Sequence, residues 1–498
     1  MNNTIRDRCA RSVYDAVVIG AGANGLAAAI TLALAGRTVV LLEGSTVVGG
    51  ACGSAELTLP GFVHDIGSAI HPLGAGSPFF RTLPLEQHGL EWVHSSAPLA
   101  HPIDSGPDAG TVFLERSVEA TVAGMGPRDG AAYHELLAPL LHDGGLPVET
   151  ISRLLLLTDV PSPGDLAHLP LGGIARMARY AALSATSASQ ALFTGPRAAA
   201  LFAGLAAHSF MPLGQAPSAG IALALALSGH AFGWPFPRGG AQRLSDALAA
   251  HFRDLGGEIV LDARVGSLKD LPESRAVLCD ITPRQLLELG GGDLPSEYAR
   301  KLGQFRYGPA AFKIDYALSG PIPWRDDVAE ACARAATVHL GGTMEEIAAS
   351  EATVGRGGLP AKPYVLLAQH TPFDPTRAPA GAHTAWAYCH LPHGSTADMT
   401  EPLESQIERF APGFRKRILA RSVLSPRRLE AINPNLVGGD ISGGRLNWHQ
   451  LLFRPAVQAI PYTTPVAGLY LCSSSTPPGP GVHGMCGYYA ARLALSRG

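Results

Sequence analysis

Three glycines near the start of the chain, Gly20, Gly22 and Gly25, have the spacing of a loop that binds the pyrophosphate of a dinucleotide. The apolar run before Gly20 predicts a strand, and residues 26–35 predict a helix, so the glycines lie at the turn between them. The first glycine would permit the sharp turn, the second would let a pyrophosphate approach the backbone, and the third would let the helix pack on the strand. The N–H groups and positive end of that helix would then bind the phosphates.

An acid at the end of the next apolar run supports the same chemistry. Glu43 follows residues 39–42 and lies close to the roughly 20-residue spacing of the acid that binds a ribose hydroxyl. An acid there disfavours a 2′-phosphate. A second glycine-rich stretch, 44–53, comes directly afterwards, and Gly49 and Gly50 would let it lie against the rest of a larger cofactor. A surface loop is the alternative interpretation.

Two histidines are the candidates for proton transfer. His71 follows the second glycine-rich stretch, and His483 lies in a Gly- and Pro-rich segment near the end of the chain. Histidine titrates near neutral pH, which suits an acid or base. Each could instead hold a loop through hydrogen bonds. We find neither a Ser-His-Asp pattern nor a spacing that predicts a metal site.

Other polar and aromatic residues have a structural explanation as good as a functional one. Asp440, Trp386 and Tyr388 could line a substrate site, but packing in strands and loops also accounts for them. Lys313 and Asp315 alternate with apolar neighbours, so a sheet face explains them without a function.

The cysteines argue against dithiol chemistry. Seven are scattered along the chain, none forms a Cys-x-x-Cys pair, and Cys52 stands alone after the first nucleotide-binding unit. We therefore expect reduced thiols rather than a redox-active pair.

Composition indicates a soluble globular protein. The 498 residues suffice for two or three domains, and 46% are hydrophobic while 16% are charged. The net charge is −3, which gives no reason to expect a nucleic-acid partner. The apolar run 220–228 is too short to span a bilayer, so we expect no integral membrane segment and a cytoplasmic protein.

The elements that must position these residues follow a broken α/β rhythm. Helical patterns dominate 131–157, with a proline-rich joint at 161–163. A second signature, 234–240, leads into a helix at 242–255 and a strand at 258–261. Strands are then predicted at 276–278, 311–318, 364–369, 384–390 and 469–472, with helices at 401–410 and 486–495.

Three blocks in this order resemble the phytoene desaturase-like flavoproteins of the amine oxidase superfamily. They are VVIGAGANGLAAA with LLE and VGGA near the start, WPFPRGGAQRLSDALA in the middle, and GLYLCSSSTPPGPGVHGMCGYYAA near the end. Ala51 stands where desaturases and amine oxidases usually have an arginine, which points to the less characterised branch of desaturase-like oxidoreductases. Pro480 replaces a frequent glycine, but Gly479 and Gly481 remain.

The resemblance implies FAD as the cofactor, bound by segments far apart in the chain. The implied contacts, by part of the cofactor, are Gly20, Gly22, Ala23, Asn24 and Gly25 for the pyrophosphate, Glu43 for the ribose, Val265 for the adenine, Gly49, Gly50 and Ala51 for the flavin side, and Gly481, Val482, His483, Gly484 and Met485 for the flavin ring and ribityl chain. At the last of these a helix start would stabilise negative charge on a reduced flavin.

The implied fold is α/β, with a Rossmann-like FAD-binding domain of the glutathione reductase and amine oxidase type and an inserted substrate domain of sheet and helix. The expected FAD-binding parts are 13–77, 213–290 and 433–498, and the expected substrate parts are a largely helical 78–212 and a sheet at 291–432.

The implied function is an FAD-dependent oxidoreductase, a dehydrogenase, desaturase or oxidase that moves a hydride from a largely apolar small molecule to flavin N5. Three alternatives stay open: a flavin-dependent isomerase or cyclase without net redox change, a non-catalytic flavoprotein that serves as a partner module, and a simple NAD dehydrogenase. The electron acceptor and a homo-oligomeric state are also open.

Overall fold

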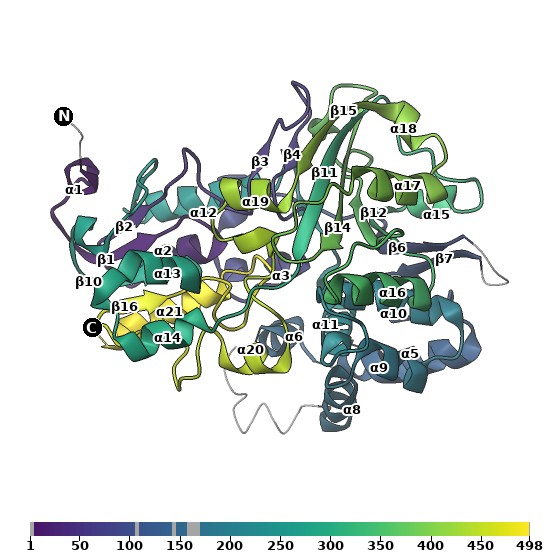
Figure 1. Cartoon of the computed structure of the whole chain (residues 1–498), viewed down its shortest axis with the longest axis horizontal. Coiled ribbons are helices and arrows are strands. Elements are labelled where there is room, and N and C mark those ends of the chain that lie inside the picture. Colours follow the sequence, from purple (N-terminus) through teal and green to yellow (C-terminus); the bar gives the residue numbers. More distant parts are fainter. Residues whose placement is uncertain (1–3, 105–108, 142–145, 157–169, 498) are drawn as a thin grey trace.

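The computed structural model describes residues 4–104, 109–141, 146–156 and 170–497. A five-stranded parallel sheet joins the beginning, middle and end of the chain (Figure 1). Its strands, in order across the sheet, are β16 (Leu469–Leu471), β10 (Glu273–Cys279), β1 (Val13–Ile19), β2 (Val39–Leu42) and β9 (Glu258–Val260). Both faces are covered, which explains why β1 and β2 appear in the sequence as continuous apolar runs.

Helices pack on the two faces of this sheet. One face carries α2 (Ala23–Leu34), α12 (Gln242–Asp254) and α21 (Met485–Arg497). The other carries α13 (Pro283–Gly290) and α14 (Ser296–Gly303). Successive strand residues point to opposite faces, so Val18 packs toward α2 while Val17 and Ile19 pack toward α13 and α14. The predicted α/β class with a Rossmann-like sheet is confirmed.

A seven-stranded mixed sheet forms a second body. Its strands, in order across the sheet, are β15 (Ile418–Leu424), β11 (Ala310–Leu318), β14 (His383–Leu391), β13 (Val365–Ala368), β12 (Ala335–Leu340), β6 (Ala97–Ile103) and β7 (Gly110–Leu114). All neighbours are antiparallel except β12 and β6. One face is largely apolar and packs against α15 (Ala329–Ala333), α17 (Thr400–Phe410) and α18 (Phe414–Arg417).

The other face lies beneath a helical layer that includes α10 (Pro196–Ala207), α11 (Ser218–Phe232) and α16 (Met344–Gly355). The remaining helices of this region are α4 (Val118–Val122), α5 (Pro127–Leu141), α6 (Val148–Leu155), α8 (Leu171–Ala181) and α9 (Ala185–Leu192). The stretch expected to be largely helical also contains β6 and β7, which join the mixed sheet. The proline-rich joint at 161–163 lies outside the described residues.

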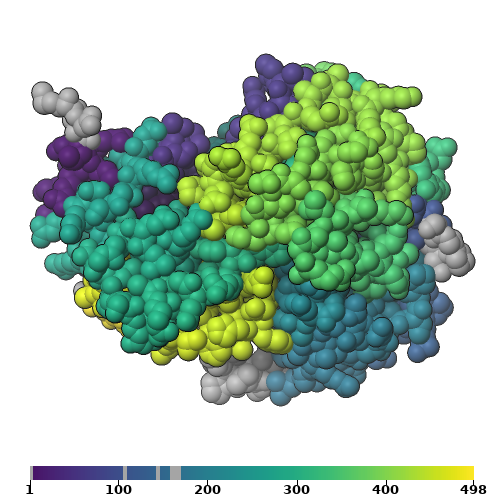
Figure 2. Space-filling model, viewed as in Figure 1, coloured from purple at the N-terminus to yellow at the C-terminus, as the bar shows by residue number. Residues whose placement is uncertain are grey.

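Short elements lie outside the two large sheets. They are α1 (Ile5–Arg8), α3 (Pro72–Ala75), α19 (Pro426–Ile432), α20 (Trp448–Phe453), the pair β3 (Ser54–Ala55) with β4 (His64–Asp65), and the pair β5 (Trp92–Val93) with β8 (Phe236–Pro237). Figure 2 shows residues near the end of the chain, in yellow, between the teal parallel-sheet body and the blue helical layer. In the described part of the chain, no helix combines the length and the apolar character needed to cross a membrane.

Candidate functional site

The first glycine loop makes an abrupt turn from β1 into α2. Gly20 has φ +95°, a conformation that favours glycine. A Cβ atom on Gly25 would lie 1.8 Å from the Gly20 carbonyl oxygen, so only glycine lets the helix begin this close to the strand. The turn therefore points the start of α2 at the carboxyl edge of the parallel sheet, where nucleotides bind in such folds.

The start of α2 fits a phosphate group. Gly22 is the N-cap residue and supplies no side-chain hydrogen bond, and the first N–H groups of a helix have no partner within it. Asn24 Oδ1 is buried and has no hydrogen-bond partner among the described residues. A polar ligand at this point would meet free donors, an unpaired amide and the positive end of the helix.

Glu43 connects the glycine turn to the segment that contains Val265. Its carboxylate accepts hydrogen bonds from the backbone N–H groups of Ala21, at 2.7 Å, and Ser45, at 2.8 Å. Its carbonyl accepts one from Ala263 N–H at 2.7 Å. The acid thus lies at the carboxyl end of β2. Val265 lies two residues after Ala263, which donates to Glu43.

The second glycine loop lies directly against the first. Gly49 N–H donates to the Ala21 carbonyl at 2.8 Å, and Gly49 also pairs with Gly22 in an isolated parallel bridge. The Ala51 carbonyl accepts a hydrogen bond from Ser68 N–H at 2.9 Å. The loops at 20–25, 49–51 and 67–71 therefore meet at one edge of the sheet.

The end of the chain completes this assembly. A Cβ on Gly487 would lie 1.8 Å from the Asn24 carbonyl oxygen, so α21 packs in close contact with the start of α2. The preceding loop contains Val482 at φ +54°, a strained value for a β-branched residue. Ser77 Oγ donates to the His483 carbonyl at 2.7 Å and holds this loop against the one that follows His71. The structure thus gathers the residues predicted to bind the cofactor.

The two predicted proton-transfer residues have different surroundings. Burial lowers the pKa of each imidazole to about 4, so both are neutral at neutral pH. His483 Nδ1 accepts a hydrogen bond from Met485 N–H at 3.0 Å, and its Nε2 donates to the Gly479 carbonyl at 3.1 Å. His71 Nε2 lies 2.9 Å from Ser68 Oγ, and its Nδ1 has no partner among the described residues. His483 therefore caps α21, and only His71 has an uncommitted ring nitrogen.

Asp280 belongs to the glycine site, although the sequence did not single it out as a site residue. Its Oδ2 accepts a hydrogen bond from Gly25 N–H at 2.9 Å and lies 2.7 Å from the place that a Cβ on Gly22 would occupy. Burial raises the pKa of the Asp280 carboxyl to about 7, and the charge of Glu43 acts in the same direction. The signal available in the sequence was an acid directly after a predicted strand, and it could have identified Asp280.

A buried ionic network supports the loop from 64 to 71. Asp65 pairs with Arg377 at 3.1 Å and accepts a hydrogen bond from Ala241 N–H at 2.7 Å, directly after the glycine pair of the middle block. Lys313 Nζ lies 2.6 Å from Asp315 Oδ2. Burial raises the pKa of the Asp315 carboxyl above its ordinary value, although the ammonium opposes this. From the sequence, Lys313 and Asp315 were expected to lie on one face of a sheet. In the structure both side chains are also buried and form an ion pair.

Asp440, a candidate for the substrate side, organises its own loop. Its carboxylate accepts hydrogen bonds from the N–H groups of Gly308 at 2.7 Å, Ser442 at 2.7 Å and Gly444 at 2.8 Å. Burial raises its pKa. Within the described residues, no group of three or more His, Cys, Asp or Glu side chains could hold a metal ion.

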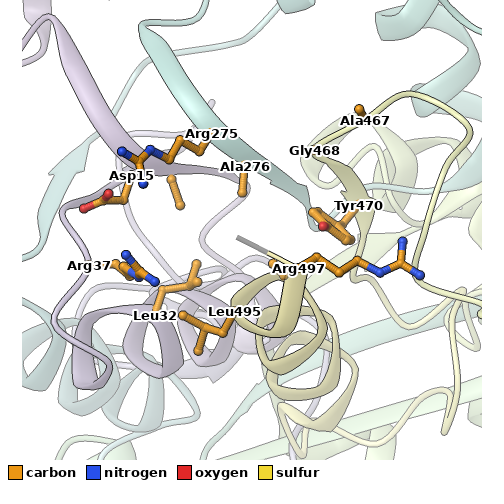
Figure 3. Close-up of a pocket in the computed structure, with 12 residues that line it drawn as sticks. Asp15, Leu32, Arg37, Arg275, Ala276, Ala467, Gly468, Tyr470, Leu495 and Arg497 are labelled. Atoms are coloured by element: carbon orange, nitrogen blue, oxygen red, sulfur yellow. The ribbon is translucent and has the colours of Figure 1, made fainter.

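A surface pocket of about 280 Å³ lies at the opposite edge of the parallel sheet (Figure 3). Asp15, Arg37 and Arg275 lie together at one end of it, and Tyr470 and Arg497 lie at the other. Asp15 is committed to Thr38, whose N–H and hydroxyl donate to it at 2.8 and 2.9 Å. Because this pocket adjoins the amino ends of β1, β10 and β16, it is separate from the glycine loops.

None of the seven cysteines is in a disulfide. Cys52 is buried, and burial raises its pKa to about 12, so it is a poor source of thiolate.

Comparison with known proteins agrees with this geometry. Residues 18–83 match the family model described as an NAD(P)-binding Rossmann-like domain. The chain is 30% identical to the mouse (Mus musculus) pyridine nucleotide-disulfide oxidoreductase domain-containing protein 2, over 97% of this chain and 93% of the relative. It is 25% identical to the lycopene-forming phytoene desaturase of Pseudescherichia vulneris, over 96% of this chain and 98% of that protein.

Among solved structures, a variant of putrescine oxidase superposes with a TM-score of 0.59 at 16% identity, over 98% of this chain and 99% of the other. At this identity the likeness concerns the fold, which is that of the amine oxidases. The mouse relative, 30% identical over nearly the whole of both chains, shows that this chain belongs to the same oxidoreductase family as pyridine nucleotide-disulfide oxidoreductase domain-containing protein 2.

Proposed function

We propose that the protein is an FAD-dependent oxidoreductase that takes a hydride from a small, largely apolar substrate. The observation that carries the proposal is the meeting of segments 20–25, 49–51 and 481–485 at the start of α2. A site for a single mononucleotide unit requires only the first of these. Loops from both ends of the chain suit a longer cofactor, and we assign the cofactor-binding unit to 13–77, 213–290 and 433–498.

The residues present could hold FAD in a definite order. The start of α2 would bind the pyrophosphate, Glu43 the ribose and the backbone of Val265 the adenine. Gly49, Gly50 and residues 481–485 would face the flavin end, where the amino end of α21 offers free N–H groups. When bound, FAD supplies a ring that accepts a hydride. The chain's own contribution is to bind, orient and exclude water.

An apolar substrate is supported by what surrounds the flavin-side loop. Ala69, in that loop, belongs to the same buried cluster as Trp386, Tyr388 and Leu366 on the mixed sheet. The helices α10 and α11 cover this cluster with side chains such as Leu201, Leu205 and Leu223. A site of this composition favours a ligand with a largely hydrocarbon body.

The buried cysteines weigh against a dithiol in the reaction. The name of the mouse relative refers to disulfide chemistry. In this chain Cys52 forms no disulfide, and burial raises its pKa. We therefore propose that electrons leave the flavin to an external acceptor.

Two measurements on the purified protein test the proposal. We expect a yellow protein that releases FAD on denaturation, and anaerobic addition of an apolar polyene that carries a hydroxyl group, such as all-trans-retinol, should bleach the flavin and yield a more oxidised product. A colourless protein that binds no FAD would overturn the proposal. Conversion of the polyene without bleaching would instead support an isomerase or cyclase.

A further inference from the structure

The two faces of β14 differ in character. Trp386, Tyr388 and His390 point toward the helical layer, whereas Ala387 and Cys389 point toward α17. The second pair is completely inaccessible, yet Trp386 keeps 7% and Tyr388 5% of its surface accessible beneath three helices. The face that carries the aromatic residues is therefore less completely covered than the face toward α17.

A carboxylate orients His390 on this face. Glu351, on α16, places Oε2 2.8 Å from His390 Nδ1, and both side chains are buried. This contact fixes the plane of the imidazole ring and leaves Nε2 as its remaining polar atom. Neither His390 Nε2 nor Glu351 Oε1 has a hydrogen-bond partner among the described residues. Buried polar atoms normally have one, because leaving them unpaired costs free energy.

A strained residue holds the imidazole in place from the other side. Phe210 follows α10 with φ +55°, a value that bulky side chains rarely adopt. Its ring centroid lies 3.9 Å from that of His390. Backbone strain persists where the surrounding structure requires it, and such positions cluster at functional sites.

Several other polar groups beside His390 are paired, although His339 Nδ1 is not among them. Tyr364 donates its hydroxyl to the Gly204 carbonyl at 2.9 Å. His208 and His339 contact each other, with 3.0 Å between their Nε2 atoms. One further unpaired polar atom lies on the same strand face, Trp386 Nε1. The face of β14 therefore offers an imidazole nitrogen and an indole N–H to a ligand, with the Lys313–Asp315 pair of the neighbouring strand close to Trp386.

We propose that His390, oriented by Glu351, binds an oxygen atom of the substrate, so that the substrate is an apolar molecule with a hydroxyl or carbonyl group rather than a pure hydrocarbon. This inference rests on the proposed function, since it takes the face next to Ala69 as the substrate side. With Nδ1–H donating to Glu351, Nε2 of the neutral ring accepts from a hydroxyl, whereas the imidazolium would donate from Nε2 to a carbonyl. The partner of Nε2 is absent from the described residues. Glu351 is a positioning residue that acts through His390.

A matched pair of ligands tests the proposal. Dodecan-1-ol and dodecane differ by one hydroxyl, and calorimetry with the purified holoenzyme measures both affinities. We expect the alcohol to bind the wild-type protein about tenfold or more tightly than the alkane, because a site built to bond a hydroxyl discriminates against its loss. In His390→Phe the alcohol should lose this advantage, while the affinity for dodecane stays unchanged.

Three further variants serve as controls for this experiment. Glu351→Gln keeps an oxygen that can accept from Nδ1 and should retain most of the preference. The double variant His390→Phe with Glu351→Leu removes both members of the pair and serves if the single variant fails to fold. Tyr316→Phe is the matched control, because it removes a buried hydroxyl without a described partner from the opposite face of the same sheet. It should leave the preference intact.

Equal affinities in the wild-type protein, or a preference for the alcohol that survives in both His390 variants, would overturn the proposal. The flavin absorbance of the same samples distinguishes the two levels of inference. A protein that contains FAD but does not discriminate the ligands defeats the assignment of His390 alone. A protein without FAD defeats the proposed function.

Discussion

Asp280 decides the charge of the glycine site. Its carboxyl lies beside Gly22 and Gly25, where an anionic pyrophosphate would bind, and burial raises its pKa to about 7. A protonated carboxyl at this position does not repel a phosphate, whereas an ionised one does. The site therefore changes character within the physiological range of pH.

We expect Asp280→Asn to remove a pH dependence. Because the folded pKa of about 7 exceeds the ordinary 3.8, the stability linked to protonation is fully present below about pH 3.8 and is lost as the pH rises through 7. The amide can still accept from Gly25 N–H. Urea unfolding of the apoprotein should show the variant gaining stability over the wild type between about pH 5 and about pH 8.

The affinity for FAD should depend on pH in the same direction as the stability does. The affinity of the wild-type protein for FAD should fall over this interval, and that of the variant should stay level. Asp15→Asn is the control, since it removes an acid from the opposite edge of the sheet. Parallel pH profiles for the wild type and Asp280→Asn would contradict the prediction.

The glycine at the N-cap of α2 gives a second test at a single residue. A Cβ on Gly22 would meet the Asp280 carboxylate at 2.7 Å and stand between the backbone and a phosphate. Its φ of −71° suits any residue, so Gly22→Ala should fold. We expect the affinity for FAD, measured by fluorescence titration, to fall by about tenfold or more. An unchanged affinity would argue against a pyrophosphate at this turn.

Among the elements, α2 and α21 form the contact on which the site depends most. Gly487→Ala would place a Cβ 1.8 Å from the Asn24 carbonyl oxygen, so the two helices must separate. We expect a loss of about 1–3 kcal/mol in the free energy of unfolding, together with weaker retention of FAD. Urea unfolding and gel filtration of the holoprotein measure these effects.

Gly172→Ala provides the matched comparison, because this exposed glycine in α8 has nothing within 4 Å of an added Cβ. It should leave stability unchanged or raise it by up to about 1 kcal/mol. If both variants behaved alike, the close contact between α2 and α21 would not be needed for stability.

Some helices and strands could be predicted from the sequence and others could not. The strands β1, β2, β11 and β14 and the helices α2 and α12 have clear periodicity or motifs, and the structure has them within a few residues of the predicted ranges. β6 escaped prediction because all its residues are buried, which removes the alternation, and because Pro98 and Pro102 argue against a strand.

In the candidate site, likewise, a sequence motif identifies some residues, whereas others become apparent only in the folded structure. Gly20, Gly22 and Gly25 are close in sequence and act through the backbone, so a short motif identifies them. The contacts of Asp280 with Gly25, and of Glu351 with His390, join residues that no local pattern connects. Their partners follow from tertiary packing alone.

At the scale of the whole molecule, the parallel sheet takes its strands from residues 13–19, 273–279 and 469–471 among others, with the mixed sheet inserted between them. A ligand at the glycine loops would therefore stabilise segments from both ends at once. We expect hydrogen exchange to slow in α2 and α21 together when FAD is added. At a hundredfold excess over the dissociation constant the stabilisation is about 2.7 kcal/mol.

α17 supplies the internal reference, since it packs on the far face of the mixed sheet. Its amides should show little change beyond that of the whole protein. Protection confined to α2, with α21 unaffected, would contradict a site shared by the two ends.

The packing of α21 on α2 also has a consequence for synthesis on the ribosome. The strand β1 and the first glycine loop emerge before the mixed sheet, and β16 and α21, which flank and cover them, are translated only after it. A nascent chain cannot close its parallel sheet until these elements leave the exit tunnel, and until then the apolar face of α2 is exposed and prone to aggregation. Loading of the cofactor is thereby a late event, and premature termination before β16 should give a chain for the proteolytic machinery rather than a partly active enzyme.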